Sequence, residues 1–101
     1  MKKDFEAKLW VNNAAIELNP FVEEFLARTA IGAVSALKGT EGVKSLDLRV
    51  EKGDVKAVVN GKDLSLTAFP NDIIANTLTG LASTLKGVGK VETLRAEVRV
   101  L

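Results

Sequence analysis

The feature that most constrains the fold of this chain is an internal repeat. When residues 5–50 are laid over residues 53–98 without a gap, 15 of the 46 aligned pairs are identical. Ordinary composition gives roughly 3 identities over such a length. We infer a tandem duplication, with repeats at about 5–52 and 53–101, inside a single domain that spans 1–101. A unit of 48 residues buries too little apolar surface to be comfortably stable alone, so we expect both units to share one core.

Alternating apolar and polar residues predict three strands in each repeat. The predicted strands are Phe5–Val11, 15–18 and 44–51 in the first repeat, and 55–59, 63–66 and 92–100 in the second. Asn60-Gly61 predicts a type I′ hairpin turn, and Asn12-Asn13 stands at the equivalent place. The short link Lys52-Gly53 makes its two flanking strands antiparallel. We expect the helical crossover to make the third strand of each repeat parallel to the second, so that a pseudo-twofold axis lies along the strands.

A helix is predicted before the last strand of each repeat, at about 20–38 and 68–86. The expected caps and end residues are Asn19 and Thr67 as N-caps, Pro20 and Pro70 in the first turns, and Gly39 and Gly87 as left-handed C-caps. The first helix is expected to bury Phe21, Val22, Phe25, Leu26, Ala30, Ala33, Val34 and Leu37. The second is expected to bury Phe69, Ile73, Ile74, Leu78, Leu81 and Leu85. The predicted class is therefore α+β, a tandemly duplicated strand-strand-helix-strand unit whose six-stranded, largely antiparallel, curved sheet carries two helices on one face.

The residue types that are missing exclude much chemistry. The chain has no Cys, His or Tyr. Without Cys or His it forms no disulfide, no typical structural zinc site and no Ser–His or Cys–His catalytic pair. We therefore predict no catalytic residues, no cofactor and no metal site, and a protein that is not an enzyme. No signal peptide or membrane span is visible, so we expect a soluble, cytoplasmic protein without membrane contact.

Both predicted helices carry the pattern Thr-x-x-Gly-x-x-Ser. Its members are Thr29, Gly32, Ser35 in the first helix and Thr77, Gly80, Ser83 in the second. A glycine inside a helix costs about 1 kcal/mol relative to alanine, so its presence in both repeats suggests a close approach to the backbone. We interpret the six residues as close packing of helix on helix or of helix on sheet. The alternative is a groove between the helices for a partner or an apolar ligand.

The polar face of the predicted sheet supplies the candidate interaction residues, which are Trp10, Val58, Arg49, Arg95 and Arg99. Trp10 and Val58 align in the two repeats and are expected to form an apolar spot for a protein contact. An aromatic ring beside basic residues also suits stacking of single-stranded nucleic acid. The formal net charge of +1 and the mixed signs on this face do not favour phosphate binding. A solvated, salt-bridged face is the third interpretation.

The segment Leu18-Asn19-Pro20-Phe21-Val22, with Thr29, Gly32 and Ser35 after it, resembles a small prokaryotic family of unknown function. The likeness covers most of the first repeat. The second repeat departs from it, with Leu66-Thr67-Ala68-Phe69-Pro70 at the equivalent positions. The resemblance implies no activity, but it implies that this chain is a fused version of a homodimer.

Our leading hypothesis for function is a non-enzymatic protein-interaction or structural module that contacts an unknown protein partner or a second copy of itself. One alternative is a nucleic-acid-binding module that uses the outer sheet face. Another is a binder of small apolar ligands between the helices and the sheet.

Overall fold

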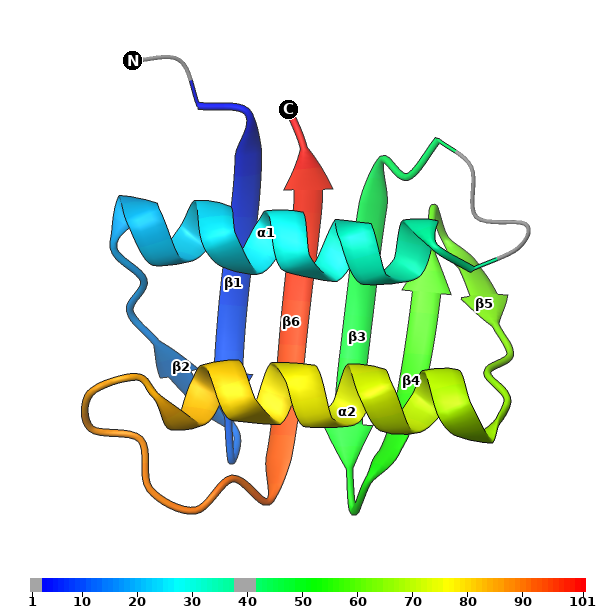
Figure 1. Ribbon diagram of the computed structural model, residues 1–101. Helices are drawn as coiled ribbons and strands as arrows, with labels where there is room; N and C mark the ends of the chain where they lie inside the picture. The colour runs from blue at the N-terminus through cyan, green and yellow to red at the C-terminus, as the bar shows by residue number, and fades with distance from the viewer. Residues whose placement is uncertain (1–2, 38–41) are drawn as a thin grey trace.

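The computed structural model describes residues 3–37 and 42–101 (Figure 1). Within these residues the elements are β1 (Phe5–Val11), β2 (Ala14–Ile16), α1 (Pro20–Ser35), β3 (Ser45–Glu51), β4 (Asp54–Val59), β5 (Lys62–Leu64), α2 (Ala68–Ser83) and β6 (Thr93–Val100). Neither helix in the described ranges is long and apolar enough to cross a lipid bilayer.

The strands form one open, six-stranded sheet in the order β2-β1-β6-β3-β4-β5, and every neighbouring pair is antiparallel. Both helices lie on the same face of this sheet and run across the strands in opposite directions (Figure 1). The molecule is a two-layer slab of 37 × 36 × 18 Å. The predicted α+β class, with six antiparallel strands and two helices, is confirmed.

The predicted strand directions were partly wrong. β3 runs parallel to β1, because both flank β6 in antiparallel pairings, and it is therefore antiparallel to β2. A crossover helix returns the chain parallel only when it lies along the strands, whereas α1 runs across them (Figure 1). Elements 48 residues apart, such as β1 and β4, consequently point in opposite directions. Any twofold relation between them has its axis perpendicular to the sheet, not along the strands.

The core lies between the helices and the sheet. The strands contribute the inward members of the predicted alternation, including Leu9, Leu48 and Ala96. The fully buried positions of the helices are Leu26, Ala27, Ala30 and Val34 in α1, and Ile74, Ala75, Leu78 and Ala82 in α2. Several of these are alanines, and their small side chains let the helix axes approach the sheet closely.

The predicted buried faces of the helices were wrong at four large residues. Phe21 and Phe69 are 74% and 75% exposed, and Phe25 and Ile73 are each 51% exposed. The predicted stripes were too wide for one helical face. Phe21 precedes the buried Ala30 by nine residues, which is about two and a half turns, so the two residues point in opposite directions.

The two-residue turns have the predicted backbone. Asn12, Asn13, Asn60 and Gly61 all have positive φ, as a type I′ turn requires, and so do Lys52 and Gly53. Asn19 caps α1, because its Oδ1 accepts a hydrogen bond of 2.8 Å from the Val22 N–H. Thr67 is the N-cap of α2, but its side chain makes no capping bond.

The helices end sooner than predicted. The C-caps are Ala36 and Thr84, both in right-handed helical geometry. Thr84 donates its hydroxyl to Leu81 O at 2.7 Å, which competes with continuation of the α-helical ladder. Gly87 has the predicted left-handed φ, +84°, but it lies in a turn after the helix. Gly39 lies outside the described residues.

Asn12 and Asn60 tie each hairpin to a distant segment by equivalent hydrogen bonds. Asn12 Oδ1 accepts from the N–H groups of Glu92 and Thr93 at 2.8 and 3.0 Å, and its Nδ2 donates to Lys90 O at 2.8 Å. Asn60 makes the equivalent bonds: its Oδ1 accepts from the N–H groups of Lys44 and Ser45, and its Nδ2 donates to Gly42 O. Each of these three residues lies 48 positions before the corresponding partner of Asn12. Each asparagine thereby joins one half of the sequence to the other.

A second equivalent pair of side chains accepts hydrogen bonds from backbone N–H groups of β1 and β4. The Glu23 carboxylate accepts the Ala7 N–H at 2.9 Å, and Asn71 Oδ1 accepts the Val55 N–H at 2.8 Å. β2 and β5 have only three residues each, so they leave part of β1 and of β4 at the edge of the sheet. These side chains satisfy donors that another strand would otherwise pair with.

Candidate functional site

The outer sheet face, which is the face away from the helices, contains all five candidate interaction residues predicted from the sequence. Trp10 lies on β1, Val58 on β4, Arg49 on β3, and Arg95 and Arg99 on β6. Strand register arranges their charges in rows. One row runs Trp10, Arg95, Arg49, Lys56 across the sheet, and the next runs Lys8, Glu97, Asp47, Val58.

The basic and acidic rows neutralise each other. Arg95 Nη2 lies 3.2 Å from Asp47 Oδ2 and 2.8 Å from Glu97 Oε1. Asp47 also faces Arg49 at 3.7 Å, and these contacts hold the carboxylates and guanidinium groups in one network. The hydrogen bonds to Asp47 raise the pKa of Arg95 above its ordinary value. A network of alternating sign does not present the one-sign field that favours phosphate binding.

The ring of Trp10 is already occupied on one side. The guanidinium carbon of Arg95 sits 4.9 Å from the ring centroid, a cation–π contact. A base that stacked on this side would have to displace Arg95 from both Trp10 and Asp47. This geometry does not favour the stacking of single-stranded nucleic acid.

Trp10 and Val58 do not form a joint apolar spot. β6 and β3 lie between their strands, which are therefore about 14 Å apart, three strand spacings, and the two residues also stand in different rows. The sequence aligned them as equivalent positions of the proposed repeat. It could not show that equivalent positions fall near opposite edges of the sheet.

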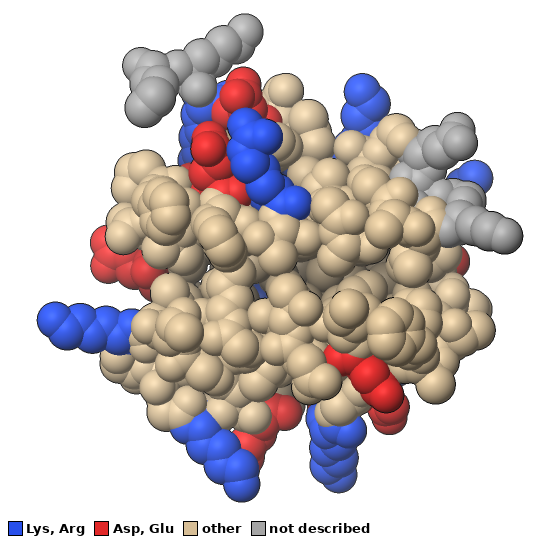
Figure 2. Space-filling view, viewed as in Figure 1, with Lys and Arg blue, Asp and Glu red and all other residues tan. Residues whose placement is uncertain are grey.

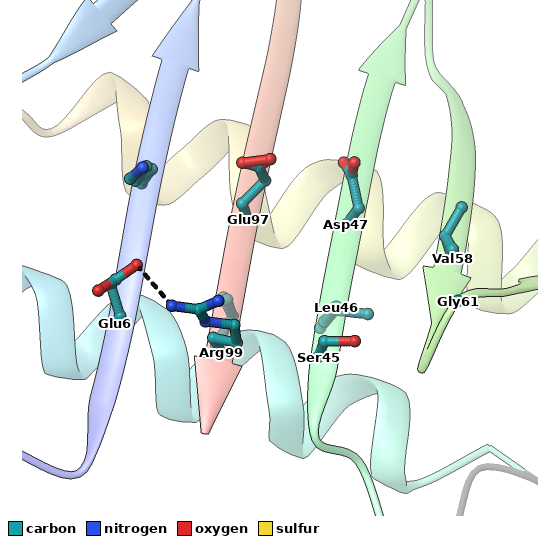
Figure 3. Close-up of a pocket in the computed structure, with 10 residues that line it drawn as sticks. Glu6, Ser45, Leu46, Asp47, Val58, Gly61, Glu97 and Arg99 are labelled. Atoms are coloured by element: carbon teal, nitrogen blue, oxygen red, sulfur yellow. Dashed lines mark ion pairs between the residues drawn. The ribbon is translucent and has the colours of Figure 1, made fainter. Parts of the chain in front are cut away.

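A shallow depression of about 370 Å³ lies on this same face (Figure 3). Figure 3 shows Glu97, Asp47 and Val58 on adjacent strands, with Glu6 and Arg99 paired beside them at 3.6 Å. No group of three or more acidic side chains in residues 3–37 and 42–101 is arranged to hold a metal ion. The depression is a polar surface whose charges are mostly paired.

The helix face, the surface formed by the outer sides of α1 and α2, has a different character. Its large side chains are Phe21, Phe25, Phe69 and Ile73. Phe21 and Phe25 touch, with ring centroids 5.9 Å apart. Figure 2 shows that the surface over the helices is mainly uncharged and that most charged groups lie toward its margin.

The charged residues of α1 are held at its flank. Arg28 pairs with Glu24 at 3.5 Å, and its guanidinium carbon lies 5.0 Å from the centroid of the Phe5 ring, at the edge of the sheet. The arrangement of an apolar centre and a charged margin is typical of protein–protein interfaces.

An interhelical groove of about 460 Å³ runs along the helix face. Its lining residues are Phe21, Val22, Phe25, Thr29, Thr77, Leu81, Thr84 and Leu85. Of the predicted close-packing residues, only Thr29 and Thr77 line it. The helices therefore leave a groove between them, which was the alternative to close packing.

The prediction that Gly32 and Gly80 allow close packing within the chain was wrong. A Cβ built on Gly32 or Gly80 meets nothing within 4 Å, and both residues are exposed. Ser35 and Ser83 are exposed as well. These four small residues lie exposed on the helix face, and the two glycines have open space above them.

The four large residues of the helix face were not predicted as surface residues, because their apolar side chains suggested a place in the core. A usable signal was present. Once Leu26, Ala30 and Val34 are taken as the buried stripe, helical periodicity puts position 21 directly opposite Ala30, and it likewise puts position 69 opposite Leu78.

Comparison with known proteins does not assign this chain to a family. The chain matches no protein-family model, no curated protein and no solved structure. The resemblance to a prokaryotic family therefore stays a prediction.

Proposed function

We propose that this chain is a non-enzymatic protein-interaction module that docks through its helix face. The observation that carries the proposal is the exposure of Phe21, Phe25, Phe69 and Ile73 on one surface. Side chains of this kind each bury 150–250 Å² when covered, so together they leave on the order of 500 Å² of apolar area in water. They lie at two ends of one face rather than in a single cluster, and an exposed apolar area of this size on one face is often functional.

The energetics favour a large apolar partner surface. Covering one such side chain contributes about 1.5–3 kcal/mol. Four of them offset much of the loss of translational and rotational freedom on association. Because Glu24 and Arg28 sit at the flank, docking on the centre of the helix face desolvates few charges.

Photo-crosslinking in cells that express the chain tests this function. Benzoylphenylalanine is placed at Ile73 on the helix face, or at Lys56 on the outer sheet face as the matched control. We expect protein adducts from position 73 and few from position 56. Adducts of equal yield from both positions, or none from position 73, would contradict the proposal.

The interhelical groove favours a second candidate function, the binding of a small apolar ligand. Its volume of about 460 Å³ is within the usual range for ligand sites. Native mass spectrometry of protein purified without detergent tests this candidate. A bound mass that disappears in Leu81→Arg supports it, and a bare chain mass argues against it.

We also propose that the chain arose by tandem duplication, as a fused form of a homodimer. The 15 identities and the equivalent hydrogen bonds of Asn12 with Asn60 support this origin. The strand order supports it too, because β3 pairs only with β4 and β6, which belong to the other half of the sequence. Such an exchange of strands is what two swapped protomers would produce.

A further inference from the structure

We propose that the partner of the helix face is a second copy of this chain, packed face to face about a twofold axis in the plane of the two helices. The inference rests on the proposed function, because it names the occupant of the same surface. Its basis is that the helix face is complementary to itself in shape, that it is large enough for a stable interface, and that the chain has little net charge.

The shape of the helix face follows from the directions of the two helices. Phe21 and Phe25 lie in the first half of α1, and Gly32 lies in its second half. Phe69, Ile73 and Gly80 repeat this order in α2. Because α1 and α2 run in opposite directions (Figure 1), the large residues occupy two diagonal corners of the helix face and the glycines occupy the other two.

A twofold axis in this plane brings unlike corners together. If the axis runs along the helices, Phe21 of one copy lies over the end of α2 that carries Gly80. If it runs across them, Phe21 lies over the end of α1 that carries Gly32. Either arrangement places protruding rings on backbone that has no side chain.

This arrangement explains why positions 32 and 80 are glycine. Each costs its helix about 1 kcal/mol relative to alanine. A side chain at either position meets nothing within 4 Å inside the chain, so internal packing does not require glycine there. An aromatic ring from a second copy, lying on the helix backbone, does require it.

The area of the broad face and the net charge of the chain are also compatible with a dimer. The broad face of the slab measures 37 × 36 Å, which is larger than the roughly 800 Å² per partner of a standard interface. The formal net charge is only +1, so two copies repel each other weakly. The exposed residues Glu24 and Asp72 lie in the N-terminal halves of α1 and α2, and Glu24 is paired with Arg28 at 3.5 Å, which makes a lipid or nucleic-acid surface a poor electrostatic match.

Sedimentation of the full chain from about 1 µM to about 500 µM tests the proposal. We expect a concentration-dependent dimer. The double substitution Gly32→Leu with Gly80→Leu fills both recesses while leaving every core contact in place, and it should weaken the dimer about 100-fold. Its melting temperature at low concentration should not fall, because leucine is the better helix former. Val58→Leu on the outer sheet face is the matched control and should leave the dimer unchanged.

A disulfide trap locates the contact, since the chain has no cysteine of its own. Phe21→Cys chains are mixed with Ser83→Cys chains, which report an axis along the helices. In a second mixture they are combined with Ser35→Cys chains, which report an axis across the helices. A mixed disulfide in one of the two mixtures supports the proposal. Disulfides in neither mixture overturn it.

The outcomes separate this inference from the function on which it rests. A chain that is monomeric at every concentration, yet gives adducts to a different protein from position 73, overturns the second copy and leaves the interaction module. A monomer without adducts overturns both. A dimer that survives the double glycine substitution places the contact elsewhere and overturns the proposed packing.

Discussion

Asn12 and Asn60 carry more of the structure than their place in hairpin turns implies. Each side chain satisfies two backbone donors and one carbonyl of the opposite half, and each backbone has a φ of +52°. Asn12→Ala should lower the free energy of unfolding by about 2–3 kcal/mol, from lost hydrogen bonds and from alanine in the left-handed region. Asn60→Ala should match it within about 1 kcal/mol.

Chemical denaturation measures both variants. Asn13→Ala is the control, because Asn13 has a φ of +68° but makes none of these bridging bonds, so it isolates the backbone cost. If Asn12→Ala is no more destabilising than Asn13→Ala, the bridging bonds contribute little.

Glu23 gives the stability a dependence on acid. The hydrogen bond from the Ala7 N–H, assisted by Lys3 at 3.1 Å, lowers the pKa of Glu23 from its ordinary value of 4.5. A carboxyl whose pKa is lower in the folded state stabilises fully above pH 4.5, and this contribution is lost as the pH falls through the folded-state pKa.

Glu23→Gln keeps an acceptor for the Ala7 N–H but cannot titrate. We expect this variant to lose less stability than the parent chain when urea melts at about pH 7 and pH 3 are compared. The equivalent Asn71 already uses a neutral amide for the same purpose. Equal losses in the two chains would show that Glu23 does not contribute to the acid response.

At the scale of elements, what the sequence predicted correctly was local. The turn residues, the Asn19 cap and the alternation of Leu9 or Leu48 depend on neighbours a few positions away, and the structure confirms them. The orientation of a helix about its own axis depends on which small residues the sheet accepts. Ala27 and Ala75 therefore face the core, while Phe21 and Phe69 are left outside.

For the candidate surfaces, too, the sequence predicted local features but not the arrangement of the elements. Sequence alignment found that Trp10 corresponds to Val58 and Gly32 to Gly80, but nothing local specifies that β6 and β3 separate the first pair. Strand order is decided by pairings between the two halves, which periodicity does not encode.

The helical glycines allow a prediction about α1 and α2 that is independent of any partner. Gly32→Ala and Gly80→Ala should each raise the free energy of unfolding of the monomer by about 0.5–1 kcal/mol, because the added Cβ has open space and alanine favours the helix. Gly61→Ala has equal space but a φ of +80°, so the same change should destabilise there. Denaturant melts at low protein concentration measure whether each of the three variants is more or less stable than the parent chain. A loss of stability in Gly32→Ala would contradict the open space above the helix.

For the whole molecule, the exchange of strands between the halves decides what a cut chain can do. Cutting the turn between Lys52 and Gly53 leaves residues 1–52 with β1, β2, α1 and β3, but β3 has lost both neighbours and β1 has lost β6. Neither half should fold as a monomer. Mixed in equal amounts, the halves should restore the six-stranded sheet, because every lost pairing is between halves.

The centre of the sheet determines whether unlike or like halves associate. Leu48 faces Ala96 across the β3–β6 pair, while Asp47 faces Glu97 and Arg49 faces Arg95. By the 48-residue equivalence, two copies of 1–52 would place Leu48 on Leu48 and Asp47 on Arg49. The exposed charge pairs would improve by roughly 0.2–1 kcal/mol each, but the overpacked core would cost about 1–3 kcal/mol.

Burial should outweigh surface charge in this balance, since the exposed pairs are also screened by salt. We therefore expect the mixed complex of the two halves to predominate over either homodimer, as native mass spectrometry of the mixture would measure. Leu48→Ala in the 1–52 half relieves the overpacking and should shift the distribution toward its homodimer. A distribution that this substitution leaves unchanged would show that the Leu48–Ala96 contact does not select the partner, and that the halves associate through features other than their central pair.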